Sequence, residues 1–273
     1  MIGLYFVISA AIMVILNSFY GIFLQSYSWW ACPLMLIGFF LGLVILHLLA
    51  VFIMILTTDI NKKPSSVKLF RFLVMKMLPM VVRLARVKIE TQGTEKIPTD
   101  SRMLLVCNHQ HDFDPVVIYT VFPDCELSFV GKKEIIEEMP FVARAMHRLN
   151  GLFIDRENDR AAAKTVISAI KLIKENEASV AIFPEGYTSS TCEILPLRNG
   201  ALKIALKSGA PIAVCVLNNT REIPKNMFRR KTVVQLKLVQ VITPSDYEGM
   251  NTAQLGDIIY NNMKETLYNI RNK

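Results

Sequence analysis

The sequence predicts an α/β domain with a mainly parallel or mixed sheet covered by helices, preceded by two N-terminal transmembrane helices and an interfacial amphipathic helical segment. Three observations lead to this prediction. Strand-like and helix-like segments alternate from Val87 onward, no Asp, Glu, Lys or Arg occurs before Asp59, and eight Lys or Arg against two acids follow between Asp59 and Glu90. We therefore expect a transmembrane helical hairpin at 1–60, basic amphipathic interfacial helices at 61–88 and an α/β domain at 89–273.

The N-terminal hairpin is predicted from two long apolar runs. Residues 2–24 and 33–56 are each long enough to cross ~30 Å of hydrocarbon as a helix. The connector at 25–32 contains Tyr27 and two tryptophans, which suit a membrane interface. His47 has no ionisable partner in either run, so we expect a packed, neutral side chain. Two apolar helices packed on the soluble domain remain the alternative.

The distribution of positive charge predicts the topology. The connector has no Lys or Arg, whereas Lys62, Lys63, Lys68 and Arg71 follow the second run. The positive-inside rule therefore predicts a cell-membrane protein with two spans and its C-terminal domain on the cytoplasmic face. Because the excess charge is confined to one short region, it favours an anionic membrane surface as the partner and argues against nucleic acid.

The basic stretch at 65–88 mixes apolar residues with Lys68, Arg71, Lys76 and Arg83. This composition is typical of interfacial helix whose basic side chains reach lipid head groups. We expect the helix to break near Pro79, because proline lacks the backbone N–H. An ordinary helix pair that covers a sheet is the alternative, and both can hold together.

The α/β part is predicted from the alternation of short apolar runs with helical patterns. The predicted strands are 87–91, 103–107, 127–130, 152–155, 180–183, 212–217 and 233–242. The predicted helices are 115–121, 133–138, 141–149, 160–176, 199–208 and 252–271. In the fourth helix, Val166, Ile167, Ile170 and Ile173 recur at helical spacing. Such alternation predicts a sheet covered on both faces.

The five cysteines indicate a reducing compartment. They show no CxxC spacing, their number is odd and their surroundings are mostly apolar. We expect buried free thiols.

One turn concentrates residues able to do chemistry. Asn108 to Asp114 contains two histidines and two aspartates between an apolar strand and a helix. Asp114 and Pro115 suit the N-cap and first position of that helix, and the turn folds His109 back toward Asp114. A histidine oriented by a carboxylate can take a proton from a hydroxyl. Because no GxSxG nucleophile motif occurs, that hydroxyl is expected to belong to the substrate; a pair that only braces a turn is the alternative.

A metal site is the competing interpretation of this turn. Its potential ligands are His109, His111, Asp112 and Asp114. The stretch starts like the HxHxDH box of metallo-β-lactamase-type hydrolases but departs from it at Phe113 and the following position. Only His47 and His147 remain elsewhere, too few for a binuclear site, so we expect no metal.

Two further strand ends carry polar groups. Asp155 and Arg156 follow one predicted strand, and Glu185 and Gly186 follow another. Ligands in open α/β sheets bind at the carboxyl ends of strands. These groups are therefore expected to form one site with His109.

Four motifs now stand in order along the chain: Asn-His-x4-Asp, Gly-x-Phe-Ile-Asp-Arg, Phe-Pro-Glu-Gly and a Pro-Ile box. In this order, over residues 87–217, they resemble the glycerolipid acyltransferase superfamily, most closely the bacterial 1-acylglycerol-3-phosphate O-acyltransferase type. The resemblance implies transfer of a fatty acyl group from acyl-CoA or acyl-acyl carrier protein to the sn-2 hydroxyl of a lysophospholipid acceptor, giving phosphatidic acid. It implies no cofactor, and membrane lipids as partners.

The resemblance also implies roles for single residues. His109 corresponds to the general base and Asp114 to the carboxylate that holds it. Arg156 and Lys132 correspond to phosphate-binding residues. The acceptor-site residues are matched by Glu185, Gly186 and a basic residue, Arg198. Each cation taken alone could instead be a solvated or ion-paired surface group.

One position departs from the superfamily pattern. The superfamily commonly has Glu-Gly-Thr-Arg-Ser, whereas this chain has Tyr187 and Thr188 at the third and fourth positions. The missing arginine weakens the expectation of a phosphorylated acceptor unless Arg198 or Lys132 compensates. Another lysolipid or alcohol acceptor, and a non-catalytic membrane lipid-binding protein, are the alternatives.

Overall fold

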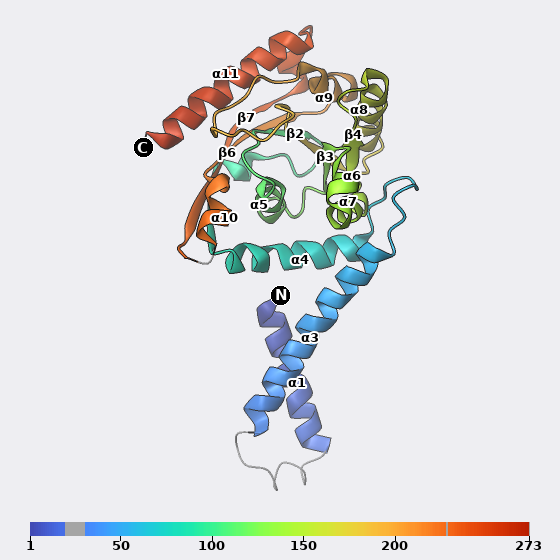
Figure 1. Ribbon diagram of the computed structural model, residues 1–273, viewed down its shortest axis with the longest axis vertical. Helices are drawn as coiled ribbons and strands as arrows, with labels where there is room; N and C mark the ends of the chain where they lie inside the picture. Colours follow the sequence, from blue (N-terminus) through green and yellow to red (C-terminus); the bar gives the residue numbers. More distant parts are fainter. Residues whose placement is uncertain (20–30, 228, 273) are drawn as a thin grey trace.

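A computed structural model describes residues 1–19, 31–227 and 229–272 of the chain. It divides into a helical stalk and an α/β domain (Figure 1). The tyrosine and tryptophans of the predicted interface connector lie outside the described residues.

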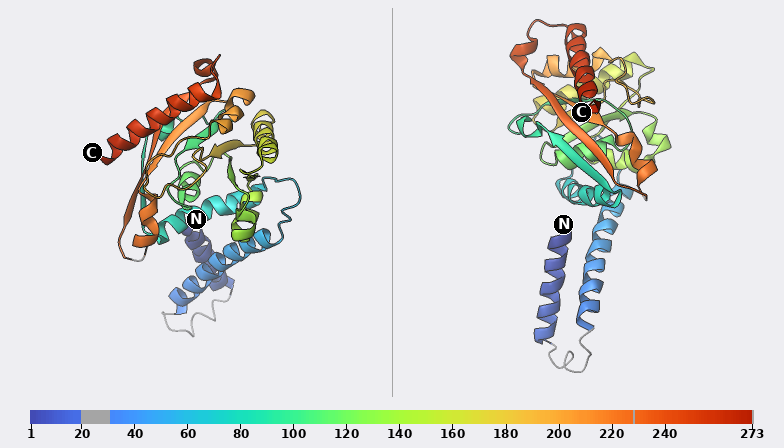
Figure 2. Two further views of the ribbon diagram at one scale, coloured as in Figure 1. Left: turned by 45° about the horizontal axis from the view of Figure 1, so that its top comes forward. Right: turned by 90° about the vertical axis from the view of Figure 1, so that its left-hand side faces the viewer.

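The stalk consists of α1 (Ile2–Phe19) and α3 (Ala31–Leu56), which lie side by side and extend away from the domain (Figure 2). Over Pro33–Leu56, α3 is long and apolar enough to cross a membrane, and it is the one such helix among the described residues. The described part of α1 is a shorter apolar helix. One membrane-spanning helix is thus supported by length and composition, and the second predicted span stays a prediction.

His47, in α3, connects both stalk helices to the following helix (Lys68–Leu84) through hydrogen bonds. It is 6% exposed, its Nδ1 is hydrogen-bonded to the hydroxyl of Tyr5, and its Nε2 lies 3.1 Å from the carbonyl oxygen of Leu73. A carbonyl can only accept, so Nε2 carries a proton, whereas the tyrosine hydroxyl can either donate to Nδ1 or accept from it. The ring is packed and buried, as predicted, and its hydrogen-bond partners lie on two other helices.

Helix α4 (Lys68–Leu84) lies across the base of the domain, between stalk and sheet (Figure 1). The predicted break near Pro79 is wrong: the helix runs through it. Leu78 and Val82, on either side of the proline, are buried, so packing holds both turns despite the missing N–H.

Arg71 differs from the expectation that it reaches lipid head groups. It is buried on the domain side of α4, where its Nη2 donates to the carbonyls of Leu127 and Leu149. Its Nε donates to Ser66. The residue therefore fastens α4 to the α/β domain.

All seven predicted strands are present and form one sheet. They are β1 (Val87–Gln92), β2 (Leu104–Cys107), β3 (Leu127–Lys132), β4 (Leu152–Ile154), β5 (Ser179–Ile182), β6 (Ile212–Asn218) and β7 (Thr232–Ile242). Their order is β1-β7-β6-β2-β5-β3-β4. Every neighbouring pair is parallel except β6 with β7. The prediction of a mainly parallel or mixed sheet is confirmed.

The helices cover both faces of the sheet. Those of the domain are α5 (Asp114–Val121), α6 (Ile135–Glu138), α7 (Pro140–His147), α8 (Asp159–Lys174), α9 (Lys203–Ser208), α10 (Ile223–Asn226) and α11 (Thr252–Arg271). One core layer contains residues of α4 and α5, and the other contains residues of α8, α9 and α11. The site therefore stands on a sheet braced from both sides.

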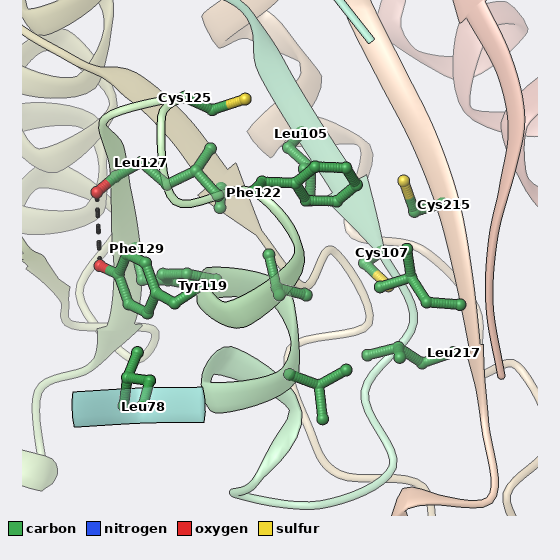
Figure 3. Close-up of a cluster of buried hydrophobic side chains, with 14 of the residues drawn as sticks. Leu78, Leu105, Cys107, Tyr119, Phe122, Cys125, Leu127, Phe129, Cys215 and Leu217 are labelled. Atoms are coloured by element: carbon green, nitrogen blue, oxygen red, sulfur yellow. Dashed lines mark hydrogen bonds between the residues drawn. The ribbon is translucent and has the colours of Figure 1, made fainter. Parts of the chain in front are cut away.

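The core layer on the α4 side of the sheet contains Cys107, the last residue of β2, which leads into the turn that carries His109. Figure 3 shows side chains from α4, α5, β2, β3 and β6 meeting there. Tyr119 is buried and its hydroxyl donates to the carbonyl of Leu127 at 3.3 Å. Cys107, Cys125 and Cys215 belong to this layer as buried free thiols. Burial raises the pKa of all three thiols, so they remain protonated and unreactive.

Candidate active site

The sequence-predicted residues follow neighbouring strands that run in the same direction. His109 follows β2, Glu185 follows β5, Lys132 ends β3 and Arg156 follows β4. Since β2, β5, β3 and β4 are consecutive and parallel, all four residues lie at one edge of the sheet.

His109 and Asp114 form the expected hydrogen bond. Nδ1 of His109 lies 2.8 Å from Oδ2 of Asp114, whose side chain is fully buried. The same oxygen accepts the backbone N–H groups of Gln110, at 2.7 Å, and His111, at 3.0 Å. A carboxylate that accepts from Nδ1 fixes the proton there and leaves Nε2 able to accept one.

The predicted N-cap role of Asp114 is wrong. Phe113 occupies the N-cap, and Asp114 is the first residue of α5. The carboxylate turns back to the preceding loop because its three donors lie there. It thus orders the loop and the imidazole rather than the helix end.

Phe183 is a site residue that sequence reasoning missed. Its ring stacks on the imidazole of His109 with centroids 4.2 Å apart and planes inclined by 11°. The carbonyl of His109 also accepts the N–H of Ser189 at 2.8 Å. An aromatic residue directly before Pro-Glu-Gly, on the strand beside β2, was the available signal.

Glu185 binds the backbone of the catalytic turn. One carboxylate oxygen accepts the N–H of His109 at 2.9 Å, and the other accepts the N–H of Leu195 at 3.0 Å. Burial raises the pKa of Glu185 to about 7, although both N–H groups and the nearby His109 oppose the shift. When this carboxyl ionises near neutral pH, the resulting carboxylate accepts a stronger hydrogen bond from the backbone N–H of His109.

Asn108 was also missed. It is buried, and its side chain exchanges two hydrogen bonds with the backbone of Leu217, donating to the carbonyl at 2.9 Å and accepting the N–H at 2.7 Å. These bonds extend the pairing of β2 with β6 beyond Cys107 and so fix where the next residue, His109, begins.

A second group contains Arg156, Arg198 and Tyr187. The guanidinium carbons of Arg156 and Arg198 lie 5.4 and 5.2 Å from the centroid of the Tyr187 ring. Nη2 of Arg198 also donates to the Tyr187 hydroxyl at 3.1 Å. Arg198 runs close to Gly186, where an added Cβ would come within 2.8 Å of its Nε. Burial lowers the pKa of Arg156, and the charge of Arg198 lowers it further.

Asp155, the acid directly before Arg156, has other partners. Asp155 pairs with Lys133 at 3.2 Å and accepts the backbone N–H of Glu157. In the described part of the chain, no carboxylate pairs with Arg156 or Arg198. The alternative that Arg156 pairs with an adjacent acid is therefore wrong, and both cations remain available to an anion.

Lys132 is not brought into either group. Its ammonium donates to Glu138 at 2.6 Å, which raises the pKa of Lys132. It pairs in register with Ile154, two residues before Arg156, so it lies on the same edge of the sheet. The structure therefore leaves it beside the site and engaged in an exposed ion pair.

His111, another potential ligand of the turn, has a local partner. Nδ1 of His111 accepts the backbone N–H of Phe113 at 3.1 Å. Among the residues that the structure describes, no three His, Cys, Asp or Glu side chains gather as a metal site.

Comparison with known proteins agrees with the motifs. A family model described as Acyltransferase matches residues 88–218. The 1-acyl-sn-glycerol-3-phosphate acyltransferase of Borreliella burgdorferi is 30% identical over 177 residues, which cover 63% of this chain and 70% of that protein. The enzyme of the same name from Haemophilus influenzae is 31% identical over 169 residues, or 60% and 68% of the two chains.

A solved structure shares the fold. The crystal structure of the 1-acyl-sn-glycerophosphate (LPA) acyltransferase PlsC from Thermotoga maritima matches with a TM-score of 0.62 and 24% identity, over 76% of this chain and 81% of that one. The matches to the Borreliella and Haemophilus enzymes, at 30% and 31% identity, cover more than two thirds of each enzyme. The family assignment therefore rests on sequence similarity as well as on the fold. The chain belongs to the 1-acyl-sn-glycerol-3-phosphate acyltransferase family and is an acyltransferase of that type.

Proposed function

We propose that this enzyme moves an acyl group from acyl-CoA or acyl-acyl carrier protein to the sn-2 hydroxyl of 1-acylglycerol-3-phosphate, with His109 as general base. The observation that carries the proposal is the bond between His109 and the fully buried Asp114. It holds the proton on Nδ1, so Nε2 faces the reaction as a proton acceptor.

The chemistry follows from that arrangement. Nε2 of His109 takes the proton from the acceptor hydroxyl as its oxygen attacks the thioester carbonyl. The tetrahedral intermediate then collapses, the carbon–sulfur bond breaks, and the departing thiolate takes the proton from the imidazolium. The products are an ester and a free thiol, and no cofactor or metal enters the reaction. A positioned base of this kind contributes ~10²–10⁴ in rate.

Recognition of the acceptor is assigned to the two arginines. A phosphomonoester is a dianion that guanidinium groups bind well, and Arg156 and Arg198 lack carboxylate partners among the described residues. Glu185 and Gly186 shape the same region, because Glu185 holds His109 and Gly186 lies against Arg198. Lys132 can bind the phosphate only if its ion pair with Glu138 breaks.

The proposal places the enzyme in the cell membrane with two spans, α1 and α3, and the domain on the cytoplasmic face. The apolar length of α3, its contacts with α1 and the basic α4 that follows support this arrangement. Substrate and product are then both membrane lipids on the side where the thioester donor is available.

The proposal is tested by thiol release. Purified enzyme in mixed micelles is given 1-acylglycerol-3-phosphate with acyl-CoA or with acyl-acyl carrier protein, and free thiol is measured. His109→Ala is expected to lower the rate by ~10²–10⁴. An unchanged rate in that variant would show that His109 is not the base.

A second acceptor class is favoured by one observation, the exposed Thr188 in place of an arginine. A panel of lysolipids and alcohols with matched acyl chains, with and without a phosphomonoester, decides between them. Preference for the phosphomonoester supports the proposal, and preference for a phosphate-free acceptor supports the rival.

A further inference from the structure

The ring of Tyr187 is the common contact of two cations. Arg156 reaches it from the end of β4, and Arg198 from the segment before α9. Tyr187 is 59% exposed, so the ring is not held there by burial in the core. The interactions recorded for its side chain are the contacts with the two guanidinium groups and the hydrogen bond from Arg198.

Arg156 and Arg198 are both positively charged and repel each other, so their contact with one ring requires a compensating attraction. Burial and, after it, the charge of Arg198 lower the pKa of Arg156, and no carboxylate in the described chain forms an ion pair with either arginine. The π face of the ring attracts both cations, and the hydroxyl accepts a hydrogen bond from Arg198. The ring thus offsets part of the repulsion and leaves the N–H donors of both groups for an anion.

The backbone joins this cluster to the catalytic turn. Glu185 accepts the N–H of His109, and Gly186 follows with φ of 79°, a left-handed conformation that favours glycine. The N–H of Arg198 donates to the carbonyl of Pro184 at 2.8 Å. The positions of Tyr187 and Arg198 relative to His109 are therefore set by one short, hydrogen-bonded segment, and Arg156 reaches the same ring from the end of β4.

We propose that Tyr187 is a positioning residue that holds Arg156 and Arg198 together as a two-cation site for the phosphomonoester of the acceptor. The proposal rests on the proposed function, because it assumes an acceptor that carries this group. It explains how the chain binds such an acceptor with Thr188, an exposed neutral residue, directly after the tyrosine.

The first test separates the ring from the hydroxyl. Tyr187→Ala removes both contacts and is expected to raise the KM for 1-acylglycerol-3-phosphate about tenfold with little change in kcat. Tyr187→Phe keeps the ring and is expected to raise this KM about threefold. The kcat/KM for 1-acylglycerol, which has no phosphate, is expected to stay constant. Tyr268→Ala, at another exposed tyrosine on α11, is the matched control and is expected to change neither value.

The second test is a rescue. Tyr187→Thr alone is expected to behave as the alanine variant does. Adding Thr188→Arg supplies a cation from the same segment and is expected to restore most of the affinity for the phosphorylated acceptor. A role of the tyrosine limited to local folding does not predict this recovery.

A binding measurement keeps this inference separate from the proposed function. Inorganic phosphate, titrated into the full-length enzyme in detergent, is expected to bind about tenfold more weakly to Tyr187→Ala than to wild type. Weaker phosphate binding supports the inference even if 1-acylglycerol-3-phosphate proves not to be the acceptor. Equal phosphate binding, or a fall in kcat for both acceptors with KM unchanged, would overturn it.

Discussion

Asp114 places all three of its hydrogen bonds on one oxygen. Oδ2 accepts from His109, Gln110 and His111, whereas Oδ1 is buried without a partner. An arrangement that leaves a buried oxygen unpaired costs free energy, which is acceptable where the other oxygen orders a catalytic group. The Asp114 side chain therefore holds the imidazole of His109 in one tautomer.

Asp114→Asn tests this tautomer argument. The amide can still accept one N–H, but it no longer stabilises the imidazolium or fixes the proton on Nδ1. We expect thiol release to fall about 10³–10⁴-fold, with the thermal midpoint lowered by only a few degrees. Stopped assays and thermal unfolding of the same preparation measure both quantities. A variant that keeps a tenth of the wild-type rate contradicts the assigned role.

Glu185 gives the fold a dependence on pH. Its pKa in the folded chain is about 7, above the usual 4.5, so the folded state keeps a proton that the unfolded state loses first. This group therefore favours folding most below pH 4.5, and its contribution falls by about 3 kcal/mol as pH rises to 7. Glu185→Gln cannot ionise and lacks this decline. The thermal midpoint of the wild type minus that of the variant is therefore expected to decrease from pH 4.5 to pH 7.

A constant difference across that range would contradict the shifted carboxyl. Glu157→Gln, an exposed glutamate beyond β4, serves as the control and is expected to follow the wild type at every pH. Measuring thiol release over the same range shows whether the proton on Glu185 also loosens His109.

The sequence predicts the local part of the site and misses the part formed across strands. His109 and Asp114 are five residues apart on one turn, so their spacing suffices. Phe183 and Tyr187 become site residues only because β5 lies beside β2 and because Arg156 and Arg198 converge on one ring. Strand order and long side-chain contacts of this kind are not encoded in spacing along the chain.

At the scale of elements, α4 is the joint between the stalk and the domain. Its buried residues Arg71, Val74, Leu78 and Val82 recur at helical spacing and face the sheet. Its exposed Leu69 and Phe72 lie on other faces. The composition of this helix predicts that its cations reach lipid head groups. Arg71, however, lies at helical spacing from the buried apolar residues, and this spacing indicates that its side chain points toward the domain.

Arg71→Met tests the joint. The variant removes the arginine donor from the carbonyl of Leu149 and one of two side-chain donors from the carbonyl of Leu127, which keeps the Tyr119 hydroxyl, and we expect a loss of about 2 kcal/mol in the free energy of unfolding. The thermal midpoint in detergent measures this loss. Arg83→Met, an exposed arginine on the same helix, is the matched control and is expected to change the midpoint little. If both variants lower the thermal midpoint equally, the buried hydrogen bonds of Arg71 do not stabilise the joint.

At the scale of the whole molecule, a stalk of α1 and α3 extends from the side of the domain that carries α4 (Figure 1). The sequence predicts a membrane attachment from a run of 58 residues without Asp, Glu, Lys or Arg, and the length and apolar composition of α3 support one membrane-spanning helix. It predicts the strand order less well, since the antiparallel β7 between β6 and β1 depends on contacts that are remote along the chain.

The two-span arrangement is tested by labelling from each side. In a background with Cys32 and Cys192 replaced by Ser, cysteines introduced one at a time at Ser26 and Asn61 are treated with a membrane-impermeant maleimide in sealed vesicles of known orientation. We expect the two positions to label from opposite faces, and an N-terminal tag to be accessible from the face of Asn61. Labelling of both cysteines from one face would show that α3 does not cross.

The position of β7 has a consequence for synthesis at the ribosome. β1 emerges directly after α4, yet its strand partner among the described residues is β7, in the register of Val87 with Thr232. Until β7 is made, the backbone groups of β1 have no strand partner, and most of the domain must be translated first. The nascent chain is therefore most prone to aggregation during this interval, and closure of the sheet by β7 is expected to be a late event in biogenesis.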